Sequence, residues 1–121
     1  MRPHEQLDVW RKAIEASLLV YRLTDVFPRD ERYGLTSQIR RASVSIAANI
    51  AEGAARKSPK EFVNFLSMAQ GSTSEVETEL LIAFRLGYFS EENYESVSAQ
   101  RNEIGRMITG LSNHLKTKIS I

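Results

Sequence analysis

The stretch QIRRASVSIAANIAEG, residues 38–53, contains the strongest pattern in this chain. Its three isoleucines, Ile39, Ile46 and Ile50, are spaced to lie on one face of an α-helix. Across residues 42–51 the other positions are small or apolar, and the only large polar side chain is an asparagine. A helix on the surface of a lone domain normally has charged residues on its outer side. This helix is therefore expected to be contacted on more than one side by close neighbours.

Two arrangements would explain a helix without outer charges. It could be a central helix inside a monomer, or it could lie at an interface between subunits. A four-helix bundle leaves one side of every helix open, so the sequence favours the subunit interface. The candidate interface residues are Ser43, Val44, Ala47, Ala48 and Ala51.

Apolar stripes at helical spacing also occupy the segments before and after this stretch. They predict four helices over about residues 6–27, 33–55, 59–87 and 91–117. The connections between them are short, so neighbouring helices should run antiparallel. No strand pattern, linker or internal repeat competes with this interpretation. The sequence predicts an all-α, antiparallel up-and-down four-helix bundle, with residues 1–121 as a single domain.

Residues that start and stop helices support these boundaries. Pro28 ends the first helix, and the run from Ser58 to Glu61 forms a capping box with proline at the first helical position. Gly71 lies mid-helix, where a close crossing or a bend is expected to require it. Gly87 suits a C-terminal cap, and Ser90 an N-terminal cap.

Composition limits the classes of protein to which the chain can belong. With 121 residues, 42% hydrophobic and 26% charged, it resembles an ordinary soluble domain. There is no cysteine, which excludes disulfides, thiolate metal sites and cysteine nucleophiles. No apolar run approaches the roughly 20 residues that cross a bilayer, and no signal peptide is recognisable. A cytoplasmic location and no membrane partner are expected.

Residues suited to catalysis or to metal binding are few. His4 and His114 are the only histidines, one near each terminus, and no serine has the setting of a nucleophile. Glu75 and Glu79 share a helix face and Glu52 ends the small-residue helix, but no Glu-x-x-His motif accompanies them. We therefore expect no enzyme activity, no cofactor and no metal, and these glutamates are expected to be ion-pair partners or solvated.

Charge is unevenly distributed behind a net charge of +1. Residues 29–60 hold seven basic and three acidic side chains, whereas residues 61–95 hold seven acidic side chains and one basic. The tail from residue 96 holds four basic side chains and one acidic. Adjacent helices of opposite charge could simply complement one another, or the basic segment could meet a polyanion. The candidate nucleic-acid-binding residues are Arg40, Arg41, Arg56, Lys57 and Lys60.

Several motifs along the chain resemble a known family. The motif residues are Leu7–Ala13 (LDVWRKA), Tyr33–Gly53 (YGLTSQIRRASVSIAANIAEG), Lys60–Phe62 (KEF), Phe65–Leu66, Ala69, Gly71–Ser72, Glu75, Glu77–Leu80 (ETEL) and Leu86–Tyr88 (LGY). Together they resemble the 23S rRNA-intervening-sequence proteins, also labelled S23 ribosomal proteins. The accessory variability proteins of diversity-generating retroelements are similar.

The resemblance implies a four-helix bundle that assembles as a ring-like homopentamer without known enzymatic activity. The retroelement accessories engage nucleic acid through basic pentameric barrels, so RNA or DNA is an implied partner. Arg40 and Arg41 match the family's I-R-R-A motif, whereas the family's proline in S-I-P-A-N-I is replaced by Ala47.

Two functions follow from these observations. The first is a non-enzymatic homo-oligomer that binds RNA or DNA through a repeated basic surface. The alternative is an oligomeric scaffold whose partner is another protein, with its arginines paired internally to Glu75, Glu77 or Glu79.

Overall fold

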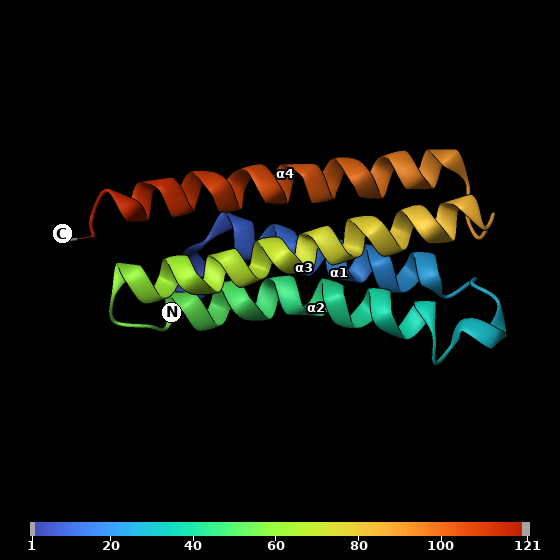
Figure 1. Cartoon of the computed structure of the whole chain (residues 1–121), viewed down its shortest axis with the longest axis horizontal. Helices are drawn as coiled ribbons and strands as arrows, with labels where there is room; N and C mark the ends of the chain where they lie inside the picture. The colour runs from blue at the N-terminus through green and yellow to red at the C-terminus, as the bar shows by residue number, and fades with distance from the viewer. Residues whose placement is uncertain (1, 120–121) are drawn as a thin grey trace.

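The computed structural model describes residues 2–119, and these fold into four long helices that run alternately in opposite directions (Figure 1). The helices are α1 (Asp8–Thr24), α2 (Leu35–Ala54), α3 (Pro59–Arg85) and α4 (Glu91–Lys116), with short 3-10 helices η1 (Pro3–Gln6) and η2 (Arg29–Glu31). Among these residues there is no strand. The predicted all-α four-helix bundle is confirmed.

Hydrogen bonds to the carboxylate of Glu31, one of them from the hydroxyl of Tyr88, stabilise the connection between α1 and α2. α1 ends at Thr24, three residues before Phe27, because Phe27 already donates its amide into a turn ahead of Pro28. Glu31 then accepts the Leu35 amide at 3.1 Å, satisfying a free donor at the start of α2. The hydroxyl of Tyr88 donates to the other Glu31 oxygen at 2.8 Å, tying this connection to the end of α3.

The ends of α3 agree with the residues that the sequence placed there. Ser58 is the N-cap, and its hydroxyl accepts the Glu61 amide at 3.2 Å. At the other end Gly87 has φ of 81°, and Tyr88 donates its amide back to Ala83 at 3.1 Å. This is a Schellman cap, which requires a left-handed residue that glycine adopts without strain. α4 begins in the same way as α3, with Ser90 accepting the Asn93 amide.

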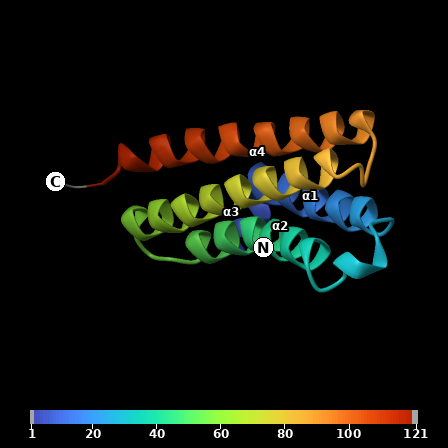
Figure 2. The same ribbon diagram turned by 45° about the vertical axis from the view of Figure 1, so that its right-hand side comes forward.

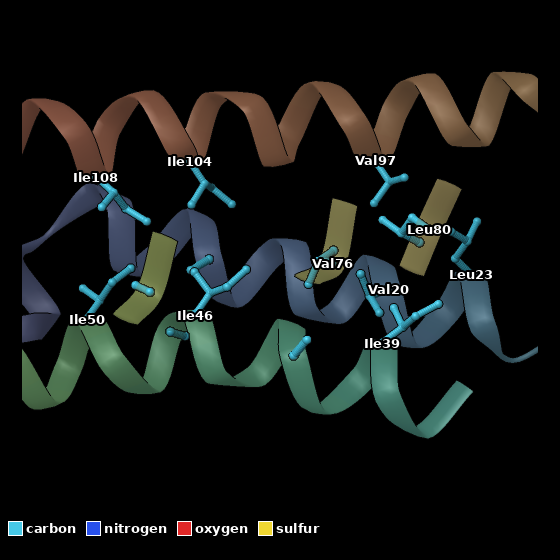
Figure 3. Packing of buried hydrophobic residues seen from close by; sticks show 14 of the residues in the cluster. Val20, Leu23, Ile39, Ile46, Ile50, Val76, Leu80, Val97, Ile104 and Ile108 are labelled. Carbon is cyan, nitrogen blue, oxygen red and sulfur yellow. The ribbon is translucent and has the colours of Figure 1, made fainter. Parts of the chain in front are cut away.

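The core consists mainly of isoleucine, valine, leucine and alanine side chains that all four helices direct inward (Figure 3). Ile39 and Ile50 of α2, Leu66 of α3 and Ile108 of α4 are completely buried. Truncating one such side chain to alanine typically costs about 2–5 kcal/mol of stability, because the cavity does not close. The apolar stripes of the sequence therefore correspond to the core.

α2 and α3 lie close together near the turn that joins them, where Gly53 meets Phe62 and Phe65 of α3. A Cβ on Gly53 would lie 2.8 Å from the Phe65 Cβ and 2.9 Å from Phe62 Cδ1, so a larger residue does not fit. The expectation that Gly71 marks the close crossing is wrong, because a Cβ there would meet nothing within 4 Å. Helix propensity flags an unfavourable glycine but cannot say which glycine faces a neighbour.

Candidate nucleic-acid and subunit interfaces

The first candidate arginine, Arg40, is held against its own molecule. Its Nε donates to Thr24 Oγ1 at 2.8 Å and one terminal nitrogen donates to the Tyr21 carbonyl at 3.2 Å. The guanidinium also stacks over the Tyr21 ring, 4.6 Å from its centroid. These contacts join α2 to the last turn of α1 and occupy two of the five N–H donors of Arg40.

The second candidate, Arg41, lies in an open groove of about 450 Å³ between α2 and α3. Glu75 and Glu79 line the same groove, yet Arg41 makes no ion pair with either among residues 2–119. Burial, and then the charge of Glu75, raise the pKa of Glu79. One Glu79 oxygen, Oε1, is buried without a hydrogen-bond partner among residues 2–119.

One ion pair of the kind that the scaffold hypothesis expected is present, although it involves neither Arg40 nor Arg41. Glu77 pairs with Arg101 of α4 at 3.0 Å, and the side chain of Arg101 is only 16% exposed. Lys12 of α1 pairs in turn with Glu103 of α4. These two ion pairs join α3 and α1 to α4.

The other three candidates, Arg56, Lys57 and Lys60, lie together at the turn from α2 into α3, and all are exposed. Arg56 makes a partial contact with Glu52 at 3.4 Å and lies over the Phe65 ring, 4.8 Å from its centroid. Lys57 and Lys60 make no ion pair among residues 2–119.

The antiparallel topology brings the C-terminal segment to the same end of the bundle (Figures 1 and 2). Lys116, in the last turn of α4, lines a groove with Val63 and Ser67 of α3, and Lys118 follows it as another exposed residue. We call this set the basic end; it comprises Arg56, Lys57, Lys60, Lys116 and Lys118. The acids at this end are Glu52 and Glu61 on these helix ends, and Glu5 and Asp8 at the start of the chain, where η1 packs on α2.

The opposite end, around the α1–α2 and α3–α4 connections, has the reverse balance. Its acids, Asp25, Asp30, Glu31, Glu91, Glu92 and Glu95, outnumber its basic residues, Arg22, Arg29, Arg32 and Arg85. The sequence indicated a basic tail but not its position, because Lys116 is far along the chain from Lys60. Arg41 lies 13 residues before the end of α2 at Ala54, about 20 Å along the helix from the turn that holds Arg56. The five predicted residues therefore do not form one patch.

The predicted interface residues divide into two groups. Ser43 and Ala47 are 2% and 5% exposed, and the Ser43 carbonyl accepts the Ser17 hydroxyl from α1 at 3.0 Å. They belong to the packing of this chain, so their assignment to a subunit contact is corrected. Val44 and Ala48 are exposed and Ala51 is half-buried, on the outer side of α2. Small residues on one helix cannot by themselves distinguish close packing within a chain from packing between chains.

Three large apolar side chains that the sequence did not single out are also exposed near this outer side. Leu18 is 46% exposed and Tyr21 is 42% exposed on α1, and Met68 is 51% exposed on α3. All three occur in helical apolar patterns, and only the rotation of each helix in the bundle shows that they point outward.

Within residues 2–119, no group of three histidine, cysteine, aspartate or glutamate residues is arranged to hold a metal ion. His4 instead packs against the edge of Trp10, with ring centroids 4.7 Å apart. None of the helices within the same range is long and apolar enough to cross a membrane.

The fold and the distribution of charge define an all-α, four-helix-bundle protein with one basic end and uncharged small residues on the outer side of α2. The sequence profile described as 23S rRNA-intervening sequence protein matches residues 5–110, so the chain belongs to the 23S rRNA-intervening sequence protein family. A crystal structure from Bacteroides thetaiotaomicron VPI-5482, described as a protein of unknown function from the S23 ribosomal protein family, is similar. Its TM-score is 0.77 at 27% identity, over 86% of this chain and 97% of that one. A search of curated proteins found no match.

Proposed function

We propose that this protein is a non-enzymatic homo-oligomer that binds RNA or DNA through its basic end. The observation that carries the proposal is the convergence of Arg56, Lys57 and Lys60 with Lys116 and Lys118, although these two groups are distant in sequence. Lysine and arginine side chains that lie close together neutralise phosphates and release their counterions. The family description, which refers to an insertion in ribosomal RNA, is consistent with a nucleic-acid partner.

Two further features support this site over the Arg40–Arg41 pair. Lys57 precedes the first turn of α3 and Lys60 lies in it, where the positive end of the helix dipole favours anions. Two N–H donors of Arg40, in contrast, are already bonded to α1, and Arg41 shares its groove with two carboxylates. Phosphates should therefore prefer the basic end.

Self-association is the second part of the proposal. Val44, Ala48 and Ala51 form an uncharged outer strip on α2, and the ring-like homopentamer implied by the family resemblance would cover it. Each added subunit repeats the basic end, so weak phosphate contacts would combine into appreciable affinity.

Fluorescence anisotropy with a labelled structured RNA and a labelled DNA duplex tests nucleic-acid binding. Five phosphate contacts per subunit would give a slope of log K against log salt of about −4.5 on duplex DNA, and about −3.5 on single strands. Lys57→Glu with Lys60→Glu should abolish binding at low salt.

The matched control is Arg29→Glu with Arg32→Glu, the same change in charge at the opposite end of the bundle. It should leave binding nearly unchanged. The proposal is refuted if the wild-type protein does not bind at about 50 mM salt, where phosphate contacts are strong, or if the two variants lose affinity equally. A partner recovered without nucleic acid would instead support the protein scaffold.

A further inference from the structure

The connection between α1 and α2 places two arginines beside one hollow. It projects at the end of the bundle opposite the turn from α2 into α3 (Figure 1). After the extended Pro28 the chain forms η2, in which the Arg32 amide donates to the Arg29 carbonyl at 3.1 Å. Side chains three residues apart on such a turn eclipse one another. Arg29 and Arg32 therefore leave the same side of the connection, and both line a hollow of about 410 Å³.

A third arginine, Arg40 in the second turn of α2, lines the same hollow. Its bonds to Thr24 Oγ1 and to the Tyr21 carbonyl, together with the Tyr21 ring, hold the guanidinium in one position. Three of its five N–H donors are left for a ligand. A guanidinium that is already ordered loses little entropy when it binds an anion. We call this site the arginine hollow; its three cations are Arg29, Arg32 and Arg40.

Positive charge in the arginine hollow is only partly compensated. Asp25 is the one acid among the described residues that line it, and none of the three arginines forms an ion pair within residues 2–119. Glu31, although it lies in the same connection, directs its carboxylate to the Leu35 amide and the Tyr88 hydroxyl. The hollow therefore has an excess of positive charge that a bound anion would neutralise.

The surroundings favour a small anion over a polymer. Thr36, in the first turn of α2, also lines the hollow, where the positive end of the helix dipole adds to the attraction. A volume of about 410 Å³ suits a small molecule. Outside the hollow this end of the bundle is mainly acidic, with Asp30, Glu31, Glu91, Glu92 and Glu95 against Arg22 and Arg85. An extended polyanion would meet these carboxylates, whereas a compact one would lie among the guanidinium groups.

We propose that the arginine hollow binds a compact anion with two linked phosphoryl groups, either inorganic pyrophosphate or the diphosphate of a nucleotide. A guanidinium binds phosphoryl oxygens in pairs, through two parallel N–H donors. Three such groups exceed the three oxygens that a single terminal phosphoryl group offers, but they match two linked groups. This site is separate from the basic end and does not depend on nucleic-acid binding.

Isothermal titration calorimetry at low salt, with pyrophosphate and with orthophosphate, tests the site. The wild-type chain should bind pyrophosphate more tightly than orthophosphate. Arg29→Gln with Arg32→Gln should weaken pyrophosphate binding by roughly tenfold or more for each lost charge-assisted contact. Both arginines are exposed, so these variants should keep the helical circular dichroism of the wild type. Failure of the wild type to bind pyrophosphate at about 1 mM, or equal affinity for the two anions, overturns the inference.

A substitution of Asp25 tests the same site in the opposite direction. Asp25→Asn removes the carboxylate that lines the hollow and should bind pyrophosphate more tightly than the wild type, because like charges no longer repel. A general loss of structure would not increase affinity, so this result supports the site directly. Unchanged or weaker binding by Asp25→Asn contradicts it.

ADP distinguishes the two sources of the diphosphate. Tighter binding of ADP than of pyrophosphate supports a site for a nucleotide, and the opposite order supports a site for free pyrophosphate. If either ligand binds equally well to Arg29→Gln with Arg32→Gln and to the wild type, that ligand does not occupy the arginine hollow and the inference is wrong for it.

Two double variants separate this inference from the proposed nucleic-acid site. Arg29→Glu with Arg32→Glu should lose pyrophosphate and keep RNA or DNA, and Lys57→Glu with Lys60→Glu should do the reverse. If the second variant loses nucleic acid and the first keeps pyrophosphate, the basic end stands and the arginine hollow is wrong. If the first variant loses pyrophosphate and the second keeps nucleic acid, the arginine hollow stands and the basic end is wrong.

Discussion

Replacing glycine by alanine should raise stability at Gly71 but not at Gly53, although both residues lie within helices. Alanine favours an α-helix over glycine by about 1 kcal/mol, and this gain applies at both sites. At Gly71 the new Cβ meets nothing within 4 Å, so the gain is retained. Gly71→Ala should therefore raise the free energy of unfolding by about 1 kcal/mol.

At Gly53 the same methyl group meets α3. Its Cβ would lie 2.8 Å from the Phe65 Cβ and 3.3 Å from the Phe62 carbonyl oxygen, which only a movement of the helix backbones can relieve. Overpacking of this kind costs about 1–3 kcal/mol. After subtraction of the gain in helix propensity, Gly53→Ala should lower the free energy of unfolding by between about 0 and 2 kcal/mol.

The difference between the two variants isolates the steric cost, because the gain in propensity largely cancels. Urea denaturation followed by circular dichroism, at one protein concentration for all variants, measures it. We expect a difference of about 1–3 kcal/mol, or several degrees in Tm for a chain of this length. If Gly53→Ala is stabilised as much as Gly71→Ala, the close approach of α2 to α3 is refuted.

Three further substitutions test the core and two of the carboxyls whose pKa is perturbed. Ile39 is completely buried, so Ile39→Ala should cost about 2–5 kcal/mol in urea denaturation, and a loss below about 1 kcal/mol would contradict the packing. Burial raises the pKa of Glu79, so its contribution to stability is present at low pH and is lost as pH rises through the folded-state pKa. Glu79→Gln should match wild type below about pH 4 and be more stable than wild type at neutral pH. Hydrogen bonds from the Leu35 amide and the Tyr88 hydroxyl lower the pKa of Glu31, so its contribution is present at neutral pH and is lost as pH falls through the lowered pKa. Glu31→Gln should therefore be less stable than wild type at neutral pH, and the gap should narrow in acid; parallel pH profiles would contradict both assignments.

The candidate sites were only partly accessible to sequence reasoning. Arg56, Lys57 and Lys60 are close in sequence, so their clustering could be predicted locally. Lys116 joins them only because α4 runs back along α3, which a charge count along the chain does not show. The sequence predicted that Arg40 could bind a polyanion, yet two of its N–H donors bind Thr24 and Tyr21 of another helix.

The sequence by itself determined the four helices, both caps of α3, the N-cap of α4 and most residues of the core. Helical periodicity and capping depend on neighbours within a few residues, so Ser58, Gly87 and the buried isoleucines are recognisable from the chain alone. Tertiary structure decided which small residues face inward, which glycine meets another helix, and where distant charges gather. Those properties depend on how each helix is rotated and which helix lies beside it. For that reason Ser43 belongs to the interior while Val44, its neighbour in the chain, lies on the outer side of α2.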